Sequence, residues 1–194
     1  RTCGVDRPVS EMTFAEIRRL DAGRWKGEEW AGERAPSLEE VLGLVPRGRG
    51  IFVEIKCGLE ILPVLCETLG ASGLAAEQVT LIGFDAGVMK AARIALPDYR
   101  ALWLVGFRQE KEGHWAPSPR GLPEMAKAIG VHGLNLKACP AVTRAFVAAV
   151  HRSGLLCCAW TVDDAEEARR LRAFGVDGIT TNRPRFIREA VFTT

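Results

Sequence analysis

The sequence predicts an α/β fold built on a parallel β-sheet, and two patterns support this prediction. From residue 51 onward, short runs rich in Val, Ile and Leu alternate with longer amphipathic segments, which gives six β-α units. Each short run is apolar at successive positions rather than at alternate ones. Because such runs are typical of strands covered on both faces, we expect a parallel sheet with helices packed against it.

Six strands are expected over residues 51–56, 79–84, 99–105, 132–136, 155–162 and 176–181. Six helices should follow them, over residues 60–71, 86–95, 121–129, 140–152, 164–173 and 184–191. Residue types that suit helix ends stand near these boundaries: Asp85 and Asp164 as N-caps, Pro140 and Pro184 in first turns, Gly154 and Gly175 after helices. Asp163 is also expected to be a helix-start residue rather than a metal ligand.

The first fifty residues contain two helical signals and no convincing strand. Two capping boxes predict one helix that begins after Thr13 and ends near Leu20, and another that begins after Ser37 and ends near Val45. The glycines of residues 47–50 precede a strand, whereas the glycine loop of a dinucleotide-binding fold follows one. We therefore expect one domain over residues 1–194, in which residues 1–50 form a helical and loop region and residues 51–194 carry the six units.

Composition excludes several classes of partner. The chain has 194 residues, with 26 Lys and Arg against 24 Asp and Glu interspersed along it, so neither nucleic acid nor an anionic membrane is expected as a partner. No apolar run approaches the ~20 residues that a transmembrane helix needs. The six cysteines lack C-x-x-C spacing and lie mostly in apolar segments, which favours a reducing, cytoplasmic environment.

Two parts of the chain carry no clear chemical signal. The three histidines, His114, His132 and His151, show no metal-binding or catalytic spacing. His114 lies in a long connection, residues 106–121, which exceeds the ordinary length of a loop and is either a lid or a disordered segment.

Two architectures accept parallel β-α units: an open doubly wound sheet and a closed eight-stranded barrel. Six strands suit the open sheet, whereas a full barrel needs two more units, which would precede residue 1. In both architectures, ligands gather at the carboxyl ends of the strands. The site residues must therefore decide between them.

Two opposite charges, Glu54 and Lys56, stand at the end of the first strand. Residues two apart on a strand face the same side, and charges in an apolar strand must be paired, solvated in a cleft or bound to a metal. Two interpretations remain open. The residues form an ion pair at the rim of the sheet, or Glu54 holds a divalent cation while Lys56 neutralises an anionic substrate oxygen, as a phosphate ester would require.

The other strand ends add aromatic and polar side chains to the same mouth. Phe84 ends the second strand, Asn135 lies near the end of the fourth, and Trp160 lies at the end of the fifth. We expect Trp160, Phe84 and Asn135 to contact the substrate, although a tryptophan such as Trp160, taken alone, is more often a core residue than part of a substrate pocket.

Several stretches, in the same order, resemble the glycerophosphodiester phosphodiesterase family. They are residues 20–25, 32–42, 53–56, 160–163 and 175–184. The resemblance implies a TIM-type (β/α) barrel that hydrolyses a small-molecule glycerophosphodiester to glycerol 3-phosphate and an alcohol with a divalent cation, Mg²⁺ or Ca²⁺. It implies that Glu54 is a metal ligand, Lys56 a catalytic contact to the phosphate, and Trp160 and Phe84 parts of the substrate pocket.

The sequence departs from this family pattern in three ways. Gly83 replaces the serine of a Ser-Phe motif, and Asn182 stands where the family often has Asp. The His-Arg-Gly, Pro-Glu-Asn and Glu-x-Asp motifs and a second catalytic His-Asp would all lie upstream of the position that matches Arg1. We therefore expect six of the eight β-α units, with the first two strands and both catalytic histidines missing, and an inactive 194-residue chain.

Two other functions remain possible on the sequence. A barrel-derived binding or scaffold module would never have carried the catalytic histidines. A doubly wound nucleotide-binding protein would need a glycine loop after a strand, and the sequence has none.

Overall fold

The computed structural model describes residues 2–192, which fall into two compact units, Arg1–Arg47 and Gly48–Thr194. No helix in this described part is both long enough and apolar enough to cross a membrane. The expectation of a single domain stays a prediction, and each unit is described by itself below.

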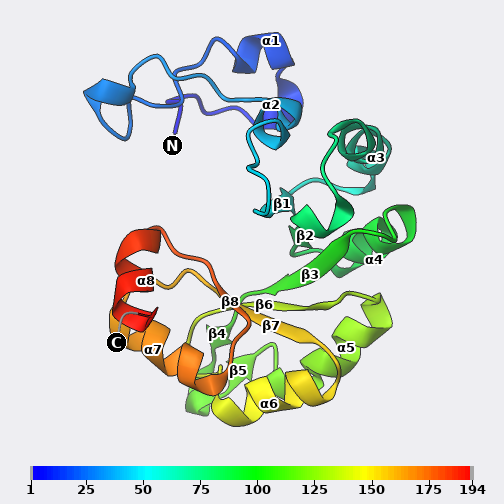
Figure 1. Ribbon diagram of the computed structural model, residues 1–194, viewed down its shortest axis with the longest axis vertical. Coiled ribbons are helices and arrows are strands. Elements are labelled where there is room, and N and C mark those ends of the chain that lie inside the picture. The colour runs from blue at the N-terminus through cyan, green and yellow to red at the C-terminus, as the bar shows by residue number, and fades with distance from the viewer. Residues whose placement is uncertain (1, 193–194) are drawn as a thin grey trace. The chain divides into compact units, whose positions relative to one another are not determined.

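The first unit contains two short α-helices, α1 (Phe14–Ile17) and α2 (Leu38–Leu42), and two 3₁₀ turns, η1 (Val9–Glu11) and η2 (Glu28–Trp30) (Figure 1). Both predicted capping boxes are present, which confirms where the helices begin. Both helices end three residues earlier than predicted. After α1, the backbone N–H groups of Arg19 and Leu20 donate to the carbonyl oxygens of Glu16 and Ile17, an i to i−3 pattern as in a 3₁₀ turn.

The second unit is built on six parallel strands, in the spatial order β1-β2-β3-β6-β7-β8. The strands are β1 (Ile51–Ile55), β2 (Val79–Gly83), β3 (Arg100–Val105), β6 (Gly133–Lys137), β7 (Leu156–Trp160) and β8 (Gly178–Ile179). Every neighbouring pair is parallel, so the predicted parallel sheet is confirmed. The sheet curls into part of a barrel, and β8 is shorter than the predicted strand at 176–181 (Figure 1).

The helices that follow the strands lie on the outer side of this curved sheet (Figure 1). They are α3 (Leu62–Ala71), α4 (Ala86–Ala95), α5 (Leu122–Ile129), α6 (Arg144–Arg152), α7 (Ala165–Phe174) and α8 (Pro184–Phe192), with short 3₁₀ turns η3 (Leu59–Ile61), η4 (Ala76–Gln78) and η6 (Pro119–Gly121) before three elements. Asp85 and Asp164 accept backbone N–H groups at the starts of α4 and α7, as predicted. Gly175 ends α7 in the left-handed conformation, with φ of 89°.

The helix predicted from residue 140 begins later, at Arg144. Thr143 is its N-cap, because the Thr143 hydroxyl accepts the backbone N–H of Phe146 at 3.1 Å. Pro140 therefore lies in the turn before the helix rather than in its first turn. A local side-chain cap outweighs the proline signal here.

The long connection at 106–121 has structure of its own. Strands β4 (Arg108–Gln109) and β5 (Trp115–Ala116) pair antiparallel around the short turn η5 (Lys111–Gly113). Residues 108–116 therefore form a hairpin rather than a loop without structure, and the interpretation as a lid stays a prediction.

The concave face of the sheet carries an apolar cluster of Ile82, Leu102, Leu104 and Cys158, against which Leu156 and Trp160 pack. Alternate residues of the same strands, such as Leu81 and Leu134, are fully buried and point the opposite way, toward the helices. Strands β2 and β3 are therefore buried on both faces, as the continuous apolar runs predict, whereas Phe52 and Glu54 of β1 are exposed. The polar side chains of Glu54 and Lys56 lie on this face near the carboxyl ends of the strands.

Candidate functional site

A cavity of about 320 Å³ opens at the carboxyl ends of the strands, and all six strands or the residues directly after them contribute to it. Its lining consists of Phe52, Glu54, Lys56, Ile82, Phe84, Leu104, Asn135, Trp160, Thr161 and Thr180. All five residues that the sequence singled out for chemistry lie in this one cavity. Phe52 and Thr180 were missed, although the two-residue period of a strand puts Phe52 on the same face as Glu54.

Glu54 and Lys56 form an ion pair at the rim of the cavity. Glu54 Oε1 lies 3.3 Å from Lys56 Nζ, and the two side chains are 30% and 78% exposed. Such an exposed pair contributes only about 0–1 kcal/mol to folding, so little free energy opposes its rearrangement around a ligand. The rim ion pair is therefore present, and it leaves both groups available to a phosphate or a cation.

Two aromatic rings form one wall of the cavity. Phe84 and Trp160 pack edge to face, with ring centroids 5.6 Å apart and an interplanar angle of 88°. Trp160 Nε1 donates to the backbone carbonyl oxygen of Asn135 at 2.9 Å, and Trp103 Nε1 donates to that of Phe84, also at 2.9 Å. The Trp160 ring is thus bonded to the neighbouring strand β6, and the main chain at Phe84 is bonded to Trp103 of the neighbouring strand β3. Trp160 packs on the core cluster and lines the cavity at once.

The glycine before Phe84 has a packing reason. A Cβ atom at Gly83 would come within 2.8 Å of Met89 Sδ and 3.2 Å of the Ile55 carbonyl oxygen. A larger residue, serine included, would require the Met89 side chain to move and the Ile55 carbonyl oxygen to give way slightly. The departure from the family's Ser-Phe motif is therefore matched by close packing around position 83.

Asn135 provides the polar group in the floor of the cavity. Its side chain is buried, with 1% of the residue exposed, and its Oδ1 atom has no hydrogen-bond partner among the described residues. Leu104 and Cys158 are its neighbours in register on β3 and β7. Burial raises the pKa of the Cys158 thiol to about 11, so this thiol stays neutral and is not a nucleophile at neutral pH.

Asp163 has a different role from the predicted one. The prediction that it starts a helix is wrong, because Asp164 is the N-cap of α7. Asp163 instead accepts Asn182 Nδ2 and Thr181 Oγ1 at 2.8 Å each and the Asn182 backbone N–H at 2.7 Å. These bonds lower the pKa of the Asp163 carboxyl group, and the largest effects come from the side chains of Asn182 and Thr181. They join the loop after β7 to the loop after β8, next to Thr161 and Thr180 of the cavity.

None of the three histidines lines the cavity. His132 Nδ1 accepts the backbone N–H of Ala101 at 3.0 Å, at the amino end of β6. Burial, with help from Arg93 and Arg100, lowers the pKa of His132. His151 Nε2 lies 3.0 Å from Asp177 Oδ2, which also accepts the Cys157 N–H at 2.7 Å. His114 is exposed in the hairpin connection. Asp177 is structural, as predicted.

A divalent cation does not find a complete ligand set here. The described residues contain no group of three or more His, Cys, Asp or Glu side chains arranged around a common point. Mg²⁺ and Ca²⁺ prefer carboxylate and carbonyl oxygens as ligands. The side chains of the cavity supply two groups of this type, the Glu54 carboxylate and Asn135 Oδ1. Since Ca²⁺ takes six to eight oxygens and Mg²⁺ six, these two groups alone do not fit a tight cation site.

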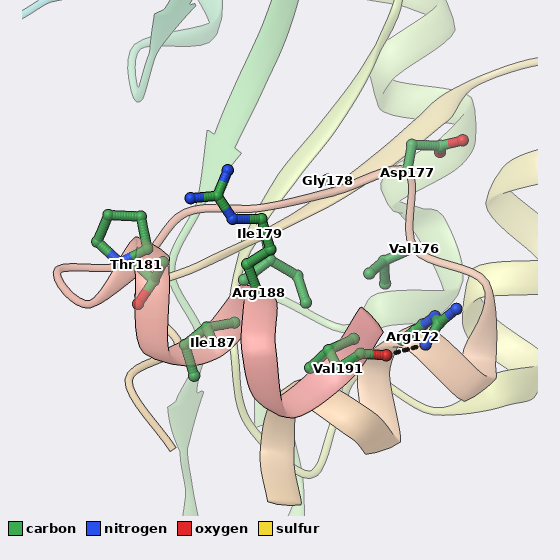
Figure 2. A pocket seen from close by; sticks show the side chains of 10 residues that line it. Arg172, Val176, Asp177, Gly178, Ile179, Thr181, Ile187, Arg188 and Val191 are labelled. Carbon is green, nitrogen blue, oxygen red and sulfur yellow. Dashed lines mark hydrogen bonds between the residues drawn. The ribbon is translucent and has the colours of Figure 1, made fainter. Parts of the chain in front are cut away.

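A second cavity, of about 240 Å³, lies between β8, α7 and α8. Figure 2 shows Val176, Ile179, Ile187 and Val191 around it, and the hydrogen bond that Arg172 donates to the Val191 carbonyl oxygen. Asp177, also in the lining, is engaged by His151 and Cys157 as described above. The lining is mostly apolar and its one carboxylate, that of Asp177, already has hydrogen-bond partners, so we assign the chemistry to the first cavity.

Comparison with known proteins gives one family over most of the chain. The model of the family described as "Glycerophosphoryl diester phosphodiesterase family" matches residues 1–186. YhdW of Bacillus subtilis strain 168 is 27% identical over 193 residues, which cover 96% of this chain and 74% of that protein. A glycerophosphodiester phosphodiesterase of Caldanaerobacter subterraneus subsp. tengcongensis is 28% identical over 188 residues, 95% of this chain and 73% of the relative.

A solved structure shares the fold. It is that of an Oleispira antarctica phosphodiesterase in complex with the product sn-glycerol-3-phosphate, with a TM-score of 0.82. The two chains are 22% identical, and the match covers 98% of this chain and 75% of the other. The six parallel strands described above therefore correspond to part of a TIM barrel, as the sequence predicted.

Proposed function

The chain belongs to the glycerophosphoryl diester phosphodiesterase family, and from this premise we propose that the cavity at the carboxyl ends of its strands binds glycerophosphodiesters. The reaction of the family is hydrolysis of the phosphodiester bond, and the products here would be glycerol 3-phosphate and an alcohol. The observation that carries the proposal is that Glu54, Lys56, Phe84, Asn135 and Trp160 line one cavity.

Each of these residues has a role that its chemistry supports. The Lys56 ammonium group, exposed at the rim, neutralises the phosphate and the negative charge that develops on its oxygens during hydrolysis. Phe84 and Trp160 pack against the carbon atoms of the substrate and exclude water on one side. Asn135 supplies a polar contact in the floor.

The family is generally metal-dependent, and we propose that Mg²⁺ or Ca²⁺ is the cation. Glu54 is the carboxylate that this cavity offers to such an ion. The bound cation would supply charge neutralisation at the phosphate. Because Glu54 alone makes an incomplete set, the substrate phosphate and further ligands would complete the coordination.

We further propose that the 194-residue chain is inactive by itself. Proton transfer to the leaving alcohol and from the attacking water needs an acid and a base in reach of the phosphate, each worth about 10²-fold or more in rate. No histidine lines the cavity, and its remaining ionisable groups are Glu54 and Lys56, which are paired with each other.

All six cysteines are free, which supports a reducing compartment such as the cytoplasm.

The experiment separates binding from turnover. In the turnover assay, the chain is incubated with glycerophosphocholine and Mg²⁺ and the release of choline is measured. In a separate binding assay, sn-glycerol 3-phosphate is titrated into the chain by calorimetry. We expect binding that Lys56→Met weakens, and no release of choline. Robust turnover would contradict the inactivity, and absence of any binding would contradict the assignment of the cavity.

The lack of an imidazole in the cavity favours a second candidate, a non-catalytic binding module derived from the barrel. Such a module should be monodisperse in size-exclusion chromatography and should melt cooperatively. A chain that aggregates or melts without cooperativity instead supports a catalytic parent of which these residues are a part.

A further inference from the structure

The floor of the cavity presents a single unsatisfied acceptor. Asn135 Oδ1 is buried and has no donor among the described residues. A buried polar atom without a partner costs about 1–3 kcal/mol, so its retention needs an explanation. The cavity itself suggests one, because Asn135 is part of its lining.

No described residue around Asn135 donates a hydrogen bond to this atom. Its register neighbours are Leu104, which has no polar side-chain atom, and Cys158, whose thiol is only a weak donor. The main chain of Asn135 is held in place, because its carbonyl oxygen accepts the indole N–H of Trp160. Strand β6 also pairs on both sides, with β3 and β7. The acceptor is thus fixed in a rigid part of the sheet and faces a ligand cavity.

The chemistry of the cavity is divided along its depth. The ammonium group of Lys56 stands at the rim with 78% of its side chain exposed. The floor combines Asn135 with Ile82 and Leu104, which are 9% and 5% exposed. A phosphate has only acceptor oxygens at neutral pH, so Asn135 Oδ1 would repel it, whereas Lys56 attracts it. A hydroxyl group on a short carbon chain suits the floor, since it donates to Oδ1 while its carbons contact Ile82 and Leu104.

We propose that Asn135 is a specificity-determining residue: its Oδ1 accepts a hydrogen bond from a hydroxyl of the glycerol moiety, so that the glycerol end of the substrate enters the floor. The phosphate then lies at the rim beside Lys56, and the alcohol to be released lies outside, toward the half-exposed ring of Phe84. This inference rests on the proposed function. It adds that the cavity selects the glycerol end of the diester through Asn135.

The test compares two phosphate monoesters that differ only in hydroxyl groups, sn-glycerol 3-phosphate and propyl phosphate. Their affinities for the 194-residue chain are measured by calorimetry, with competition between them to show a shared site. The wild type should bind the glycerol ester about tenfold more tightly, the gain that one good hydrogen bond to a desolvated acceptor supplies. Asn135→Leu should reduce this ratio to about one.

A structural role for Asn135 makes the opposite prediction for stability. If the acceptor awaits a ligand, Asn135→Leu removes an unsatisfied polar group from the core and raises the melting temperature of the free chain while it lowers the preference for glycerol. If Asn135 is needed for folding, the melting temperature falls. Leu136→Ile, on the same strand but facing the helices, is the matched control and should leave the ratio unchanged.

The outcomes distinguish the two proposals. A wild-type ratio near one, with both ligands bound and both weakened by Lys56→Met, overturns the role of Asn135 and leaves the cavity as the phosphate site. A ratio that Asn135→Leu does not change, or a lower melting temperature of that variant, also overturns it. If neither ester binds the wild type, the proposed function fails and the inference fails with it.

Discussion

The indole N–H of Trp160 donates to the backbone carbonyl oxygen of Asn135 over 2.9 Å, and this bond joins the aromatic wall of the cavity to its floor. Trp160 ends β7 and Asn135 lies on β6, so the bond crosses between neighbouring strands. Because the ring also packs edge to face on Phe84, its position is set from two sides. Wall and floor should therefore respond together to mutation.

Replacing Trp160 by Phe should affect both stability and ligand binding. The variant keeps an aromatic ring but loses the N–H donor, which leaves the Asn135 carbonyl oxygen without this bond. We expect the free energy of unfolding in urea to fall by about 0.5–1.5 kcal/mol, and the affinity for sn-glycerol 3-phosphate to fall severalfold.

Trp103→Phe is the matched control for this change. It removes an equivalent bond of 2.9 Å, from Trp103 Nε1 to the Phe84 carbonyl oxygen, but Trp103 does not line the cavity. A similar loss of stability with a much smaller loss of affinity is expected. Equal losses of affinity in the two variants would show that general destabilisation explains both.

Lys56→Met should weaken phosphate binding without destabilising the fold. Lys56 is 78% exposed and its pair with Glu54 contributes little to stability, so the free energy of unfolding should change by no more than about 0.5 kcal/mol. Removal of the ammonium group should lower the affinity for both sn-glycerol 3-phosphate and inorganic phosphate about tenfold or more, measured by calorimetry at low salt.

Lys137→Met provides the comparison for Lys56. Lys137 ends the strand β6 and is exposed, but it is outside the lining of the cavity. Its replacement removes the same charge from the same end of the sheet. If both variants lose affinity equally, the overall positive charge matters rather than the position of Lys56.

Glu54→Gln tests whether this carboxylate serves a cation. In the wild type, the Glu54 carboxylate should repel a phosphate in the absence of metal and should bind Mg²⁺ in its presence. We expect millimolar Mg²⁺ to tighten the binding of sn-glycerol 3-phosphate to the wild type and to have little effect on Glu54→Gln. The same Mg²⁺ response in both proteins would assign Glu54 to the rim ion pair alone.

The bonds around Asp163 predict a pH-dependent contribution to stability. The pKa of Asp163 is lowered in the folded state, chiefly by the side chains of Asn182 and Thr181, from the ordinary value of 3.8. A carboxyl group whose pKa is lowered in the folded state stabilises the protein at pH values above its pKa in the unfolded state. This stabilisation is lost as the pH falls through its pKa in the folded state. Wild type and Asp163→Asn should therefore differ most in melting temperature at neutral pH.

The difference between these two proteins should shrink when the pH falls below about 3.8. Thermal melts between neutral pH and the acid range measure it, and Asp164→Asn, at the N-cap of α7, serves as a comparison for the loss of a nearby carboxylate. A constant difference across this pH range would show that the charge on Asp163 does not contribute.

Much of the fold follows from the local sequence. The apolar runs predict all six strands, and the capping residues Thr13, Ser37, Asp85 and Asp164 lie at helix starts as expected. These features depend on residues two to four positions apart. The geometry of a strand or of a helical turn sets how the side chains of such residues are placed relative to one another. The start of α6 at Arg144 was misplaced because a Thr143 cap and the Pro140 signal compete within four residues.

The candidate site was only partly accessible to the same reasoning. The period of a strand puts Glu54 and Lys56 on one face, and the parallel sheet brings Phe84, Asn135 and Trp160 to the same end of the strands. The pairing of Asp163 with Asn182 joins loops 19 residues apart, and no local pattern encodes it.

The sequence by itself determined the order of the elements, the parallel sheet and the end of the sheet at which polar side chains gather. Only the tertiary structure decided that Asn135 Oδ1 is buried without a partner, that Asp163 joins two loops, and that the histidines lie outside the cavity. The physical reason is that periodicity fixes the direction of a side chain, whereas its partners depend on strand register and on the curvature of the sheet.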